Sequence, residues 1–364
     1  MSSSEVCGIV KKAFTGIFPE LQTVCIPVAD GGEGTADAFL YALGGRRVGV
    51  RAADPAGREI DSFYGLLPDG KTAVIETAAA SGLPLTEGRN DPLAATTLGT
   101  GRLIAHALDA GCDRILLGIG GSATTDAGAG ALTALGFRFL DKNGRAVGPG
   151  GGGLSALASI DASGKHKRLR SCEITVACDV DNPLYGPRGA ARVFAPQKGA
   201  DADAVDILDA NLRHFAEVVK KQTGVDLQRL KGAGAAGGLG AGLYAFAGAR
   251  LSPGIDIVLD MNRFDTAIAD CDLVITGEGK FDSQSLAGKV PIGIAKRAAA
   301  IRKPVVVLAG DVGAGIEAAY GMGITAVFST NRRAVPFEQA RLTCREDMFA
   351  AAEALARVIR GREK

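Results

Sequence analysis

Glycine and hydroxyl residues that suit phosphate binding follow an apolar run in the first half of the chain. Residues 115–119 predict a strand, residues 124–135 predict a helix, and a glycine turn joins the two. Such a turn presents free backbone amides to an anion, and its hydroxyls suit the metal ion of a triphosphate. The simpler interpretation is that Ser122 or Thr124 only caps the helix. We predict a nucleotide-phosphate site made of four residues: Gly120, Gly121, Ser122 and Thr125.

Two carboxylates after another apolar run predict a metal site or a proton acceptor. Asp179 and Asp181 stand two positions apart, and alternate residues of an extended chain share one face. Together they can hold Mg²⁺, or one of them can accept the proton of a substrate hydroxyl, and the sequence leaves both roles open. The competing interpretation is an Asx turn before Pro183. We predict both as metal ligands, Asp179 also as a catalytic residue and Asp181 also as a substrate contact.

Asp30 and Glu33 follow the strand predicted over residues 24–28 and precede a helix. The carboxyl end of a parallel strand is where α/β proteins place their sites, so we predict that both acids bind substrate. A capping box is the structural alternative.

Glu278, Lys280 and Lys289 follow the strand predicted over residues 273–276. We predict that Glu278 binds substrate and that both lysines are catalytic, because cations neutralise the charge on a transferring phosphoryl group. A solvated charged turn is the alternative. Residues 196–199, which include Lys198, offer a lysine and an amide but predict an exposed polar loop.

Three glycine patterns resemble nucleotide-binding motifs. Residues 65–72 match the Walker A pattern, but Pro-Asp-Gly and the β-forming residues after it predict a hairpin tip. Residues 232–237 match G-x-G-x-x-G, but no convincing strand precedes them, which favours a packed glycine loop. The third pattern lies at residues 118–123 and indicates an alternative function. A nicotinamide-dinucleotide-dependent oxidoreductase would use four residues: Gly118, Gly120, Ala123 and Asp141.

The elements that must position these residues alternate between apolar β-branched runs and alanine-rich helical runs, which predicts an α/β fold with parallel sheets. Residues 46–77 differ and predict short antiparallel strands. We predict two domains: 1–42 with 263–364, built from both chain ends, and an inserted α/β domain over 43–262.

Composition narrows the function classes. The chain has 364 residues, a formal net charge of +1, 5% aromatic residues and no Trp, which argues against nucleic-acid partners. The sequence has three histidines and no nucleophile elbow, so the candidate catalytic groups are acids, lysines and hydroxyls. Such a set is typical of phosphoryl transfer. Seven scattered cysteines and a polar N-terminus predict a cytoplasmic protein without a membrane partner, and a homo-oligomer stays open.

Five of these stretches, taken in order, resemble the bacterial type of glycerate kinase, the glycerate 2-kinase family: residues 27–35, 118–124, 177–184, 232–240 and 275–279. The resemblance extends from about residue 5 to the C-terminus. It implies a Rossmann-like parallel-sheet domain built from both chain ends and an inserted α/β domain. It also implies the substrates ATP and D-glycerate, the ion Mg²⁺, and the products 2-phosphoglycerate and ADP.

The sequence departs from that family at its start. Members begin with a further strand and an Asp-Ser-Phe-Lys-Gly turn, whereas Met1 stands just after that turn. We therefore expect a chain that is truncated, wrongly started, or a catalytically impaired ligand-binding homologue.

Overall fold

Two compact units make up the chain in the computed structural model, which describes residues 1, 3–26, 28 and 35–362. The first unit combines Met1–Asp30 with Ile255–Lys364, and the second is Gly31–Gly254. The domains 1–42 with 263–364 and 43–262 remain a prediction.

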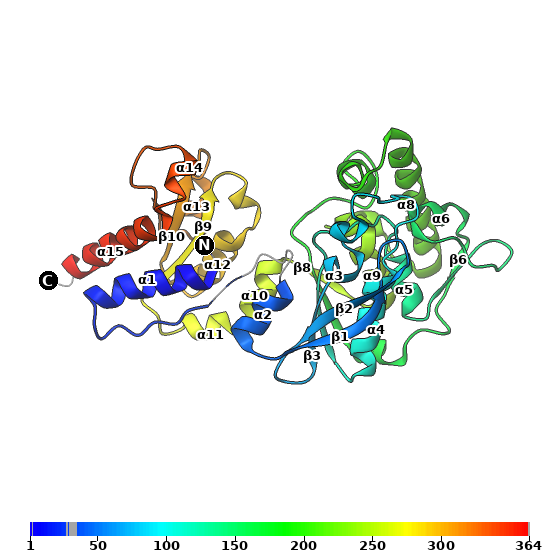
Figure 1. Cartoon of the computed structure of the whole chain (residues 1–364), viewed down its shortest axis with the longest axis horizontal. Coiled ribbons are helices and arrows are strands. Elements are labelled where there is room, and N and C mark those ends of the chain that lie inside the picture. The colour runs from blue at the N-terminus through cyan, green and yellow to red at the C-terminus, as the bar shows by residue number, and fades with distance from the viewer. Residues whose placement is uncertain (2, 27, 29–34, 363–364) are drawn as a thin grey trace. The chain divides into compact units, whose positions relative to one another are not determined.

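A mixed six-stranded sheet forms the centre of the second unit, in the order β1-β2-β3-β4-β7-β8 (Figure 1). β1, β2 and β3 pair antiparallel, whereas β3, β4, β7 and β8 run parallel. The carboxyl ends of these four strands therefore meet at one edge of the sheet. The strands are β1 (Arg46–Ala53), β2 (Glu59–Leu66), β3 (Thr72–Glu76), β4 (Arg114–Gly118), β7 (Glu173–Ala177) and β8 (Arg250–Ser252).

Helix α8 (Ala202–Thr223) shows why the local sequence forms the elements around this sheet. Asp201 caps its first turn by accepting from Ala204 N at 2.8 Å, and Gly224 ends it at φ 78°. Its buried apolar residues recur every three or four positions, as one face of a helix requires: Val205, Leu208, Leu212, Phe215 and Val219.

Helices and short strands complete the second unit. Its other helices are α2 (Thr35–Leu43), α3 (Ala78–Ser81), α4 (Leu98–Asp109), α5 (Ala129–Ala134), α6 (Gly150–Gly153), α7 (Ala190–Phe194) and α9 (Leu239–Ala247). Single 3₁₀ turns lie at Leu83–Thr86, Leu154–Ala156, Lys167–Arg170, Pro196–Lys198 and Leu227–Arg229. Ala235–Gly238 is a kinked turn with left-handed backbone at Ala236 and Gly237. β5 (Arg138–Leu140) and β6 (Ser159–Asp161) pair in a separate ribbon.

The first unit has a parallel sheet in the order β11-β10-β9, with helices on both faces. Side chains of β10 alternate between two cores, since Val305 and Val307 face the core with α12 while Val306 and Leu308 face α1 and α15. The strands are β9 (Val274–Phe281), β10 (Val305–Val312) and β11 (Ala326–Ser329). The helices are α1 (Ser3–Ile17), α10 (Gly254–Met261), α11 (Phe264–Ile268), α12 (Val290–Ala300), α13 (Ala318–Gly321), α14 (Phe337–Ala340) and α15 (Cys344–Arg362), with a 3₁₀ turn at Ser285–Ala287.

The α/β class and the antiparallel start of the larger sheet are confirmed, whereas two predicted elements are wrong. The described residues between 24 and 28 form no strand, and α5 begins at Ala129 rather than at residue 124. Ala127 (φ 53°) and Gly128 (φ 76°) have left-handed backbones, which prevents the helix from starting earlier. Within the described chain, no helix is long and apolar enough to span a membrane.

Candidate functional site at the carboxyl ends of the parallel strands

The turn predicted to bind phosphate follows β4 and is held by the segment after β3. Leu83 N donates to Gly121 O and Ala123 N donates to Ser81 O, each at 2.9 Å. Because α5 starts only at Ala129, the turn over residues 119–128 is irregular and its hydroxyls cap no helix. The capping interpretation is therefore wrong.

The turn combines exposed backbone with buried hydroxyls. Gly120 and Gly121 are exposed, whereas Ser122 and Thr125 are buried. Among the described residues, no hydrogen-bond partner is present for the Oγ1 atoms of three buried threonines: Thr77, Thr124 and Thr125. A buried hydroxyl without a partner is costly, so such atoms point to a bound ligand or water.

Asp126 stabilises this turn by accepting hydrogen bonds from backbone amides and from a threonine hydroxyl. Its Oδ2 accepts from Thr97 N (2.9 Å) and Gly130 N (3.1 Å), its Oδ1 accepts from Gly128 N (3.0 Å), and Thr97 Oγ1 donates to both oxygens. Burial raises the pKa of this carboxyl, and the hydrogen bonds to its charged form oppose that effect. Asp126 thus joins the turn to the start of α4.

Lys198 is a charged residue of this site, and the prediction that it lies in an exposed polar loop is wrong. Its side chain is buried rather than exposed, and Nζ donates to Ser122 Oγ at 3.0 Å and to Thr124 O at 2.7 Å. Burial lowers the pKa of Lys198 to about 8, although the nearby Asp126 favours the charged form. The 3₁₀ turn Pro196–Lys198 carries no local signal that its lysine points inward.

Asn90 joins the same two segments through their backbones. Its Nδ2 donates to Ala123 O at 2.9 Å and to Lys198 O at 2.8 Å. The turn after β4 and the turn that carries Lys198 are therefore joined by both side-chain and main-chain contacts.

The glycine stretch over residues 232–238 packs between two other motifs. Ala127 N donates to Gly237 O, and Gly234 N donates to Asn182 O, each at 2.9 Å. A Cβ at Gly237 would lie 2.2 Å from Thr124 O, so the stretch needs glycine for close backbone packing. No strand precedes it, which confirms the packed-loop interpretation.

Asp179 and Asp181 have different partners after the end of β7. Asp179 Oδ1 accepts from Gly254 N at 2.8 Å, whereas the exposed Asp181 pairs with Arg188 at 3.0 Å. Three grouped metal-ligating side chains occur nowhere in the described part of the chain. Carboxylate oxygens still match the preference of Mg²⁺, which commonly uses one or two protein carboxylates together with substrate phosphates.

In the first unit, Glu278, Lys280 and Lys289 gather at the carboxyl end of β9. Glu278 Oε1 is buried without a hydrogen-bond partner among the described residues. Burial raises the pKa of this carboxyl, whereas a hydrogen bond with Ser285 and the charge of Lys289 oppose that effect. Lys280 Nζ lies 3.5 Å from an Asp282 carboxylate oxygen, and Lys289 directly precedes α12. Charged residues expected to act together are thus close in space.

Two predicted residues lie outside the described part of the chain, and one acid was missed. Asp30 and Glu33 are not among the described residues. Glu76, at the end of β3, is buried, and its Oε1 accepts from Ala36 N at 2.6 Å. In the sequence Glu76 is followed by a threonine and three alanines, which match no motif of a functional site.

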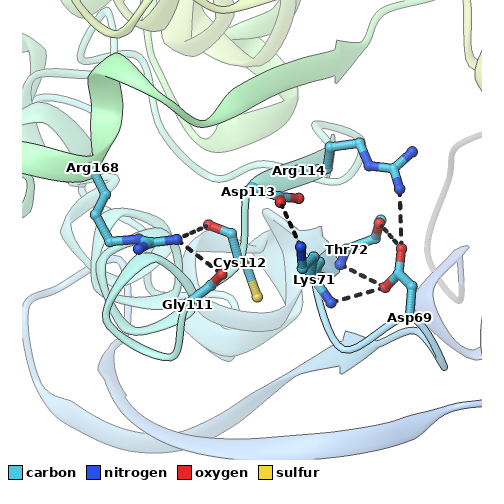
Figure 2. Close-up of polar contacts among 8 residues, drawn as sticks. All are labelled: Asp69, Lys71, Thr72, Gly111, Cys112, Asp113, Arg114 and Arg168. Carbon is cyan, nitrogen blue, oxygen red and sulfur yellow. Dashed lines mark hydrogen bonds and ion pairs between the residues drawn. The ribbon is translucent and has the colours of Figure 1, made fainter.

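The Walker A look-alike is a hairpin, as predicted. Figure 2 shows Asp69 accepting from the backbone amides of Lys71 and Thr72, each at 2.9 Å, with Lys71 Nζ turned toward Asp113 at 3.7 Å. This lysine belongs to the amino-terminal edge of β3, away from the carboxyl ends of the strands.

The dinucleotide alternative is not favoured. Asp141 accepts from Asn143 N and Arg145 N in a turn after β5, and β5 lies with β6 in a separate sheet from β4. The acid is therefore not placed on a strand next to the glycine turn, as a ribose contact requires.

Comparisons with known proteins agree with one another. The model of the glycerate kinase family matches residues 1–360. The chain is 49% identical over 361 residues to glycerate kinase from Bacillus subtilis (99% of this chain, 94% of the relative). It is 50% identical over 330 residues to glycerate 2-kinase from Escherichia coli K12 (90% and 87%). A crystal structure from Salmonella typhimurium LT2, provisionally called glycerate kinase 2, matches with TM-score 0.87 and 46% identity over 100% of this chain and 96% of that chain.

Proposed function

Because this chain belongs to the glycerate kinase family and is a phosphotransferase, we propose that it transfers the γ-phosphoryl group of ATP to D-glycerate, giving 2-phosphoglycerate and ADP. The observation that supports nucleotide binding is the structure of the turn after β4. There, exposed glycine backbone adjoins buried hydroxyl groups and the buried ammonium group of Lys198.

In the proposed reaction, the oxygen of the 2-hydroxyl group of glycerate forms a bond to the γ-phosphorus of ATP. The bond between that phosphorus and the oxygen of the leaving ADP breaks. The hydroxyl proton passes to Asp179 or Asp181. Gly120, Gly121, Ser122 and Thr125 bind the phosphates, and Lys280 and Lys289 neutralise negative charge on the transferring group.

Mg²⁺ would be held by Asp179 and Asp181, whose carboxylate oxygens are suitable ligands. When bound, it supplies charge neutralisation and orientation of the phosphates. Asp30, Glu33 and Glu278 are proposed to contact glycerate.

The proposal is tested by measuring ADP release with ATP, Mg²⁺ and D-glycerate, against a control without glycerate. Adding enolase identifies the product, because enolase converts 2-phosphoglycerate but not 3-phosphoglycerate to phosphoenolpyruvate. Glycerate-dependent ADP release with phosphoenolpyruvate formation supports the proposal. Release without phosphoenolpyruvate would contradict the 2-phosphoglycerate product, and no release would contradict the activity.

A further inference from the structure

The Lys198 ammonium is a buried cation with neutral hydrogen-bond partners. It is 3% exposed, and its Nζ donates to the Ser122 hydroxyl and to the Thr124 carbonyl. Among the described residues, both acceptors of its Nζ are uncharged oxygens. Burying an ion is unfavourable unless another charge or enough hydrogen bonds compensate for it.

Asp126 compensates for this charge only in part. Its carboxylate favours the protonated lysine, but its two oxygens already accept from Thr97, Gly128 and Gly130. Among the described residues, Asp126 is the charged group that counteracts the effect of burial on the pKa of Lys198. Among the described residues, the positive charge of this site therefore has no direct anionic partner.

The hydrogen-bonding capacity of the site is also incomplete. An ammonium has three N–H donors, and two of those of Lys198 have acceptors. The neighbouring hydroxyls of Thr124 and Thr125 are fully buried and have no partner among the described residues. Spare donors beside a buried positive charge match the oxygens of an anion.

We propose that Lys198 is a positioning residue for nucleotide phosphates: it holds the Ser122–Thr125 turn in its binding conformation and supplies the positive charge that the phosphates neutralise. This inference rests on the proposed function, because it identifies the anion as the phosphates of the nucleotide. It adds a residue far from the glycine turn in sequence. A purely structural role would need only packing and two hydrogen bonds, and would not distinguish ligands with phosphates from ligands without them.

The test compares Lys198→Met, which keeps the chain length and removes the charge, with Lys221→Met on the exposed end of α8. Isothermal titration calorimetry measures binding of ADP, adenosine and D-glycerate to each full-length protein. We expect Lys198→Met to weaken ADP binding about tenfold or more, the size expected when one charge-assisted contact is lost. Binding of adenosine and D-glycerate should stay unchanged, and Lys221→Met should bind all three like the wild type.

Several outcomes would overturn the inference. They are unchanged ADP binding by Lys198→Met, equal weakening of ADP and adenosine, weakening confined to D-glycerate, or a wild type that binds ADP no better than adenosine. If Lys198→Met does not fold, Lys198→Gln, which keeps a donor for Ser122 but not the charge, is judged by the same criteria. If neither variant folds, Lys198 is essential for the structure itself and the inference is rejected.

Failure of the proposed function would look different. A wild type that binds ADP through its phosphates, but releases no ADP with D-glycerate, would contradict the proposed reaction. The comparison of Lys198→Met with the wild type would still decide the role of Lys198.

Discussion

Lys198 Nζ and Ser122 Oγ form a 3.0 Å hydrogen bond across 76 positions of sequence. This contact joins a 3₁₀ turn before α8 to the turn that follows β4. It places a positive charge next to Ser122, which directly follows the exposed Gly120 and Gly121 in the turn at the carboxyl end of β4. The contact also has consequences for stability that can be measured without a substrate.

Stability should rise with pH between about 8 and 10.5 because of Lys198. Its pKa is lowered by burial from 10.5 to about 8, so within this window the unfolded chain binds more protons than the folded one. The free energy of unfolding therefore increases with pH there, by about 3 kcal/mol in total, and the destabilisation is present in full below pH 8.

Urea unfolding of the wild type and Lys198→Met at several pH values checks this prediction. The stability of the wild type should increase relative to that of the variant across the window, since other groups titrate equally in both proteins. Parallel curves would show that the lysine is not held with a lowered pKa.

Replacing Asp126 by Asn should destabilise the second unit by about 3 kcal/mol. The new amide would turn a donor toward one of the N–H groups of Thr97, Gly128 or Gly130, which would lose its acceptor. Urea unfolding measures the change, with Asp203→Asn on the exposed first turn of α8 as the control. The control should change stability by no more than about 0.5 kcal/mol, and a similarly small effect of Asp126→Asn would contradict the role of Asp126.

Local patterns predicted the elements of this site better than its contacts. The hairpin at residues 65–72 followed from Pro-Asp-Gly turn chemistry, and β4 followed from its apolar run. The helix predicted from residue 124 was wrong because the buried Asp126 accepts from the amides that follow it, and the left-handed Ala127 and Gly128 delay the helix.

The position of Lys198 could not be predicted from its neighbours in sequence. Pro196 and Gly199 are typical of a surface turn, and they do form a turn. What buries the lysine is packing against a segment 76 positions away, and such a contact leaves no periodic signal in a single sequence. In contrast, the glycines at 232–238 predicted close packing because the residues around them offered no strand.

Gly237→Ala should destabilise the second unit more than a substitution that only strains the backbone. At Gly237 the backbone has φ +65°, and a Cβ would lie 2.2 Å from Thr124 O and 2.4 Å from the Thr125 Cα. Gly224 is the matched control, since its φ is +78° and no heavy atom lies within 4 Å of its Cβ position. We expect a loss of about 1 kcal/mol for Gly224→Ala and of about 3 kcal/mol or more for Gly237→Ala.

Thermal or urea unfolding of the two alanine variants gives the comparison. Gly237→Ala should also weaken ADP binding, because the added methyl group would displace the Thr124–Thr125 turn. Equal stability losses would indicate that residues 232–238 move to accommodate the methyl group without a further loss of stability. The glycines would then not be required for packing.

Lys71→Met should leave the KM for ATP unchanged, although Lys71 belongs to the chain's Walker A match. Lys71 Nζ faces Asp113 (Figure 2), at the opposite end of the parallel strands from the proposed phosphate turn. Its side chain is largely exposed. An exposed ion pair of this kind contributes about 0.5 kcal/mol, so stability should hardly change. A large rise in the KM for ATP would place the nucleotide at the hairpin and contradict the turn after β4.

Asp179→Asn should lower kcat by about 100-fold while leaving the fold intact, as expected when a proton acceptor or metal ligand is removed. Asparagine keeps a side-chain oxygen that can accept from Gly254 N, so this contact within the second unit is preserved. The matched variant is Arg188→Ala, which removes the partner of Asp181 without altering either acid. Steady-state kinetics at varied Mg²⁺ then separates the two roles of Asp179. A kcat restored by excess Mg²⁺ identifies a metal ligand, and a kcat that stays low at saturating Mg²⁺ identifies the proton acceptor. Wild-type turnover of Asp179→Asn at all Mg²⁺ concentrations would exclude both.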